Sequence, residues 1–100
     1  MKEKKFDLFG TKYTIKEVDK LTDDKGEAIY GHNNGSSKVI EIARTINGFK
    51  VADEDVRLTL YHELFHAIFG EGCYGGSNAD EPLVEWCAKC IRSLIKQKII

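Results

Sequence analysis

The segment from Leu58 to Phe69 most constrains the fold, because it is apolar almost all the way round a helix. Its apolar side chains are Leu58, Leu60, Tyr61, Leu64, Phe65, Ala67, Ile68 and Phe69. A helix of this kind is buried on more than one side. We therefore expect it to lie between a sheet and a second helix, so that the domain combines both kinds of element.

The ends of this helix carry recognisable signals. The acidic run at 53–55 offers capping oxygens and negative charge at the positive end of the helix dipole. We expect the helix to extend to about Phe69 and to stop at Gly70 and Gly72. After a glycine-rich loop, a second helix is expected to open at Asp80-Glu81-Pro82, where proline is tolerated in the first turn.

Before residue 53, apolar and polar side chains alternate with the two-residue period of β-strands. Apolar and polar side chains alternate on both sides of a turn at Gly10-Thr11, as in a hairpin, with the apolar positions at Phe6, Leu8, Tyr13 and Ile15. A second pair of strands is expected around 28–32 and 38–43. The sequence thus predicts one α+β domain over residues 1–100, with a small, mostly antiparallel sheet packed on the two helices.

Charge and hydropathy exclude several classes of function. The 15 Lys and Arg side chains nearly balance the 16 Asp and Glu side chains. No global field is therefore available to attract nucleic acid or an anionic membrane, and neither is expected as a partner. No segment approaches the ~20 apolar residues of a membrane span, and no signal-peptide pattern follows the charged N-terminus. The expected location is the cytoplasm.

The apolar segment also contains two histidines and a glutamate, namely His62, Glu63 and His66. Burial of imidazoles and a carboxylate without partners is costly, so something must satisfy them. His62 and His66 lie one turn apart on the same helix face, about 6 Å along the axis, and their ring nitrogens can converge on one ion. Because zinc readily takes imidazole ligands, we predict that His62 and His66 bind Zn²⁺.

Glu63 is offset around the helix from the two histidines. This position lies near the ion without making Glu63 the natural third ligand. From there, Glu63 can act as a general base on the water molecule that fills an open ligand position in a catalytic site. The pattern is the H-E-x-x-H arrangement of zinc metallopeptidases.

Two runs of sequence carry a family resemblance. Tyr61-His62-Glu63-Leu64-Phe65-His66-Ala67-Ile68 and Asp80-Glu81-Pro82-Leu83-Val84-Glu85-Trp86-Cys87-Ala88 resemble the small phage-encoded metallopeptidases related to the ImmA/IrrE family of minimal zincins. This resemblance implies zinc-dependent hydrolysis of peptide bonds in a protein or peptide substrate, such as a regulatory protein. It also implies the host cytoplasm as the location if the protein is phage-encoded.

The resemblance further implies an acidic third ligand on the later helix. Glu85, inside that helix, can point at the motif helix and is the favoured position. Glu81 lies at the start of the helix and is the alternative. If Glu81 were the ligand, Glu85 could instead accept a hydrogen bond from a zinc-binding histidine.

The remaining expectations concern the substrate. In zincins the substrate usually lies extended along an edge strand beside the motif helix, and the segment from Lys38 to Ala43 is the candidate here. Three side chains are candidates for stabilising an oxyanion: His32, Tyr61 and Tyr74.

A second interpretation of the zinc site stays open, because the chain is too short for the second lobe of ordinary zincins. In that interpretation the zinc is structural, and the protein is a non-catalytic interaction module or an antagonist of a host protein.

Overall fold

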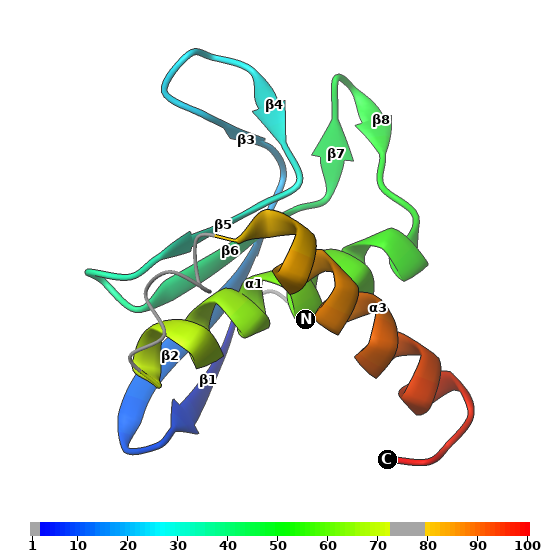
Figure 1. Ribbon diagram of the computed structural model, residues 1–100. Coiled ribbons are helices and arrows are strands. Elements are labelled where there is room, and N and C mark those ends of the chain that lie inside the picture. Colours follow the sequence, from blue (N-terminus) through cyan, green and yellow to red (C-terminus); the bar gives the residue numbers. More distant parts are fainter. Residues whose placement is uncertain (1–2, 73–79) are drawn as a thin grey trace.

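The computed structural model describes residues 3–72 and 80–100 of the chain. Strands fill the first half of the described chain and helices the second half (Figure 1). The expected α+β class, with a mostly antiparallel sheet and two helices in the described residues, is confirmed. The elements are β1 (Glu3–Leu8), β2 (Thr11–Val18), β3 (Leu21–Thr22), β4 (Ala28–Ile29), β5 (Gly31–Asn34), β6 (Val39–Ala43), β7 (Thr45–Ile46), β8 (Phe49–Lys50), α1 (Asp53–Glu71) and α3 (Glu81–Lys96).

Four strands form the main sheet, in the order β1-β2-β6-β5. The predicted hairpin is present as β1 and β2, and it turns through Phe9 and Gly10, whose φ angles of 53° and 88° suit a tight hairpin turn. β6 runs parallel to β2 and antiparallel to β5. Two further hairpins, β3–β4 and β7–β8, project beyond this sheet (Figure 1).

The prediction of Lys38–Ala43 as an edge strand is wrong. β6 lies inside the sheet between β2 and β5, and its Ile40 and Ile42 side chains are 0% and 1% exposed. The alternation of isoleucine with Glu41 was compatible with an edge strand. Pairing with the distant strand β2 nevertheless makes β6 internal. The edge strand beside the helices is β5.

α1 packs against the sheet on one side and against α3 on the other, as expected for a helix that is apolar nearly all round. Its sheet side contacts β5 and β6. The core between them is continuous and consists of Tyr13, Ile15, Ile40, Ile42, Val51, Val56 and Ala67. The sheet and α3 therefore hold α1 in place from both sides.

The N-terminus of α1 differs from the expectation. Ala52 is the N-cap and provides no side-chain hydrogen bond, so the acidic residues do not cap the helix. Two of them, Asp53 and Glu54, make ion pairs instead. Asp53 accepts a hydrogen bond from Arg44 at 3.2 Å, and Glu54 pairs with Lys96 of α3. These contacts tie the start of α1 to the strands and to the end of α3.

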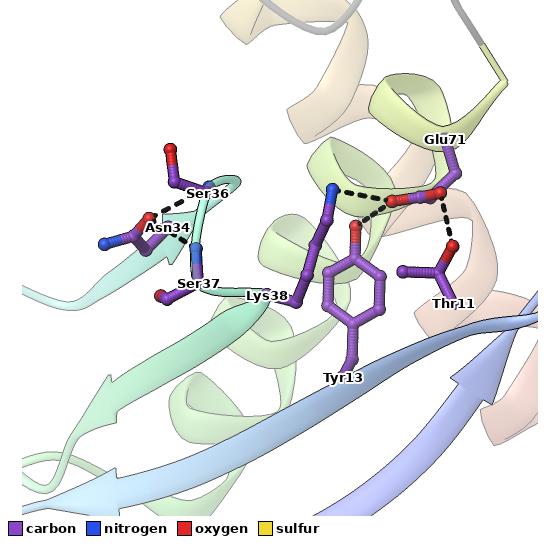
Figure 2. A network of polar contacts seen from close by, with 7 residues as sticks. All are labelled: Thr11, Tyr13, Asn34, Ser36, Ser37, Lys38 and Glu71. Atoms are coloured by element: carbon purple, nitrogen blue, oxygen red, sulfur yellow. Dashed lines mark hydrogen bonds and ion pairs between the residues drawn. The ribbon is translucent and has the colours of Figure 1, made fainter.

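The C-terminus of α1 is held by one carboxylate, that of Glu71 (Figure 2). It accepts hydrogen bonds from Thr11 Oγ1 (2.8 Å), Tyr13 Oη (2.6 Å) and Lys38 Nζ (3.0 Å). A negative charge is unfavourable at this end of a helix dipole, and the three donors offset that cost. The hydrogen bonds lower the pKa of Glu71 to about 2. Burial and the Glu71 contact raise the pKa of Tyr13 to about 12.

We expect this cluster to make stability depend on pH in the acid range. The ordinary pKa of Glu71 is 4.5 and the folded value is about 2. The stabilisation is therefore complete above about pH 4.5 and is lost as the pH falls towards 2. Glu71→Gln should lower the free energy of unfolding at pH 7 and flatten its decline between pH 4.5 and 2, measured by urea unfolding. Glu27→Gln, which alters an exposed side chain, should retain the wild-type decline. Equal pH profiles for all three proteins would contradict this role of Glu71.

Candidate metal centre

Three side chains converge between α1 and α3. The Nε2 atoms of His62 and His66, one turn apart on α1, are 3.2 Å from each other. The two carboxylate oxygens of Glu81 face them, with Oε2 at 2.9 Å from His62 Nε2 and Oε1 at 2.9 Å from His66 Nε2. His62, His66 and Glu81 are thus a possible metal-binding triad.

The position of Glu81 follows from the way α3 begins. Asp80 is the N-cap, and its Oδ1 accepts a hydrogen bond from the backbone N–H of Leu83 at 3.1 Å. Pro82 occupies the first turn, as expected. Val84 and Ala88 are fully buried and fix the rotation of α3. Glu81 is consequently the first residue of the helix and projects across the two histidines of α1.

Glu85, the favoured third ligand in the sequence analysis, contacts the other side of a histidine ring. Its Oε1 accepts a hydrogen bond from His62 Nδ1 at 3.2 Å. Glu81 thus contacts both Nε2 atoms, whereas Glu85, one helical turn later, contacts only the Nδ1 side of His62. The structure brings Glu81 to the triad and places Glu85 as the acceptor that orients His62, which is the alternative arrangement.

The donor set fits a metal cation. The hydrogen bond to Glu85 puts the ring proton of neutral His62 on Nδ1, which leaves the Nε2 lone pair directed at His66 and Glu81. A cation placed among these ligand atoms, which lie 2.9–3.2 Å apart, would be bound by His62 Nε2, His66 Nε2 and Glu81. Neighbouring ligand atoms around a tetrahedral zinc ion, at 2.0–2.1 Å from the metal, are separated by about 3.3 Å. The observed spacing is close to that value.

Glu63 is the buried carboxylate beside this triad. It is 8% exposed, and burial raises its pKa above the ordinary carboxyl range, against the opposing effect of His62 and His66. Its side chain lies against β5, because a Cβ atom built on Gly31 would be 3.2 Å from Glu63 Cγ. Glu63 therefore occupies the space between the triad and the edge strand.

Two hollows meet at Glu63. Gly31, His62 and Glu63 line both of them. The first hollow, about 410 Å³, is completed by Tyr30, Asp55, Leu58, Thr59 and Glu85. The second hollow, about 380 Å³, is completed by His32, Asn33, His66 and Glu81. Both hollows thus adjoin His62, Glu63 and β5, and the second hollow adjoins the whole triad.

The three candidates for stabilising an oxyanion do not all line the hollows. His32 lines the second hollow from β5, whereas Tyr61 lines neither hollow. Tyr74 lies outside the described residues.

Gly31 and Asn33, which line the second hollow, were not among the site residues expected from the sequence. A glycine inside a strand pattern indicates close approach of another segment, and this signal could have identified Gly31. Nothing in the sequence singles out Asn33.

Comparisons of the chain with models of protein families, with curated proteins and with solved structures found no match. Among the helices of the described residues, none has both the length and the apolar character needed to cross a membrane.

Proposed function

We propose that this protein is a zinc-dependent metallopeptidase that hydrolyses peptide bonds of a protein or peptide substrate. The observation that supports the proposal is the convergence of His62, His66 and Glu81 beside the buried carboxylate of Glu63. The H-E-x-x-H spacing and the two adjoining hollows add to it.

His62, His66 and Glu81 would hold the ion, and Glu85 would keep the His62 ring in the correct tautomer and orientation. A zinc ion bound there supplies Lewis acidity, which polarises a carbonyl and acidifies water. Glu63 accepts a proton from the attacking water molecule and delivers it to the amine that leaves when the peptide bond breaks. The position of Glu63 between the triad and β5 suits this transfer.

The substrate is proposed to bind along β5. Ala43 N–H donates to Tyr30 C=O at 2.8 Å, which fixes the alternation of hydrogen bonds between β5 and β6. By that alternation, the backbone groups of Gly31 and Asn33 point away from β6, towards the outer edge of the sheet. No other strand of residues 3–72 and 80–100 pairs with that edge. An extended peptide can therefore add to β5 and cross both hollows.

The type of protein that serves as substrate is proposed only from the family resemblance. The similarity to ImmA/IrrE proteins favours a regulatory protein of the cytoplasm as substrate, in the host if the gene belongs to a phage. The nearly balanced charge gives no reason to propose nucleic acid as a partner.

An open ligand position favours catalysis over a purely structural zinc. Structural zinc sites are closed by four protein ligands, whereas catalytic sites keep one position for water or substrate. Among residues 3–72 and 80–100, three candidate ligands converge, the Glu81 side chain is 63% exposed, and the second hollow adjoins all three.

We expect the two glutamates of α3 to affect zinc binding unequally. Glu81→Gln removes a proposed ligand and should weaken zinc binding by more than about 100-fold. Glu85→Gln removes only a contact that orients His62 and should weaken it by about 10- to 100-fold. Competition with a chromophoric chelator measures the zinc affinity of both variants. A larger loss for Glu85→Gln would reverse the assignment of ligand and orienting residue.

The proposed activity is tested on a mixture of peptides from a digested bacterial proteome. Mass spectrometry should detect new termini with the zinc-loaded protein, none after removal of the metal by a chelator, and the same termini after zinc is restored. Cleavage that persists without metal, or no cleavage by the zinc-loaded protein, would contradict the proposal.

A further inference from the structure

We propose that Asn33 selects substrates by accepting a hydrogen bond, through Oδ1, from a donor side chain of the peptide in the second hollow. The inference rests on the proposed function and adds a substrate preference to it. The preferred side chains at one position near the cleaved bond are amides, hydroxyls or ammonium groups.

Asn33 faces the helices from the edge strand. It is two residues from Gly31 in β5, so the two positions share a face of the sheet. That face is directed at α1, because a Cβ atom at Gly31 would meet Thr59 Cγ2 and Glu63 Cγ. Asn33 is also paired with the buried Ile40 of β6. Asn33 is one of the residues that line the second hollow.

The Oδ1 atom of Asn33 is buried, and no residue of the described chain donates a hydrogen bond to it. Buried polar atoms are nearly always paired, so an unpaired carbonyl in a hollow needs an explanation. The neighbouring Asn34 shows the contrast (Figure 2). Its Oδ1 accepts hydrogen bonds from the backbone N–H groups of Ser36 and Ser37, at 3.0 and 3.1 Å, and so shapes the turn. Within residues 3–72 and 80–100, the Oδ1 atom of Asn33 has no such partner.

A peptide added to β5 would supply the missing partner. The backbone groups of Asn33 point to the outer edge, so a peptide residue pairs directly opposite it. Residues opposite one another on neighbouring strands have their side chains on the same face, with Cβ atoms about 4.5–5.5 Å apart. The peptide side chain opposite Asn33 therefore enters the second hollow. Glu81, which also lines that hollow, is a further acceptor.

Cleavage profiles of three proteins test the inference, again with a proteome-derived peptide mixture and mass spectrometry. The wild type should favour Asn, Gln, Ser, Thr or Lys at one position near the cleaved bond. Asn33→Leu should shift that one position to apolar residues. Asn33→Asp should enrich Lys and Arg there by about tenfold, since a charged acceptor strengthens the hydrogen bond. The preferences at other positions should not change.

Two readouts besides turnover accompany the profiles. Asn33→Leu should keep or raise the Tm of the free protein, because it removes an unpaired buried carbonyl. In a Glu63→Gln background, which should bind peptides without cleaving them, Asn33→Leu should weaken the Kd of one cleaved peptide about tenfold.

The outcomes separate this inference from the proposed function. Identical profiles for all three proteins, or a wild-type preference for Asp and Glu at the position in question, would overturn the role of Asn33 alone. A lower Tm with an unchanged profile would make Asn33 a structural residue. If the zinc-loaded wild type cleaves no peptide, the proposed function fails, and this inference fails with it.

Discussion

Glu63→Gln is expected to reduce peptide cleavage by about 10²- to 10⁴-fold while leaving zinc binding close to that of the wild type. Glutamine has nearly the shape of glutamate and can fill the same buried position, but its amide cannot accept the proton of a water molecule. Glu63 is not one of the three side chains whose ligand atoms converge. Turnover of one cleaved peptide and zinc titration of the same preparation measure the two effects.

Glu54→Gln is the matched control for this prediction. Glu54 lies on the same helix but pairs with Lys96 and lines neither hollow. Its substitution should leave both turnover and zinc affinity nearly unchanged. Full turnover by Glu63→Gln would assign the base to another group. Loss of zinc in Glu63→Gln would make Glu63 a ligand.

Gly31→Ala should lower both stability and activity, because β5 and α1 are in close contact at this residue. An added Cβ atom would lie 2.5 Å from Thr59 Cγ2 and 3.3 Å from the backbone oxygen of Glu41. Thr59 is β-branched and has only two favoured χ1 rotamers in a helix, so the Thr59 side chain or the strand must shift. Overpacking of this kind costs about 1–3 kcal/mol of unfolding free energy. Displacement of β5 from Glu63 should also reduce turnover at least tenfold. Urea unfolding measures the loss of stability, and a peptide cleavage assay on the same preparation measures the loss of turnover.

Thr59→Ser provides the rescue, since it deletes the Cγ2 atom that the new Cβ atom would meet. The double variant Gly31→Ala/Thr59→Ser should recover most of the lost stability and part of the lost turnover. A double-mutant cycle isolates this coupling. Strictly additive effects, or a Gly31→Ala protein as stable as the wild type, would contradict the close contact of β5 with α1.

Local sequence patterns were sufficient to predict the helices and the first hairpin. Because residues 58–69 are apolar on nearly all faces of the helix, they predicted that α1 lies between the sheet and a second helix. Pro82 correctly indicated the first turn of α3. Strand order was not predictable in this way. Whether β6 is an edge or an internal strand depends on pairing with β2, more than 20 residues earlier, and the alternation within 38–43 contains no information about that partner.

The site was predictable in kind but not in detail. The spacing of His62 and His66 defines a pair of converging nitrogens from sequence alone. The choice between Glu81 and Glu85 instead depends on where α3 starts and how it is rotated, which the Asp80 cap and the burial of Val84 determine. Gly31 is important because α1 contacts it in the folded protein, and only the three-dimensional structure shows such a contact.

Zinc titration of the metal-free protein, with Tm followed in the same series, is the decisive test of the metal centre. One zinc ion should bind per chain and raise the Tm, because a ligand at 100 times its Kd stabilises a folded protein by about 2.7 kcal/mol. The same titration of His66→Ala should show weak binding and little increase in Tm. Failure of the wild-type protein to take up zinc, or a Tm that does not respond to it, would contradict a metal centre formed by His62, His66 and Glu81.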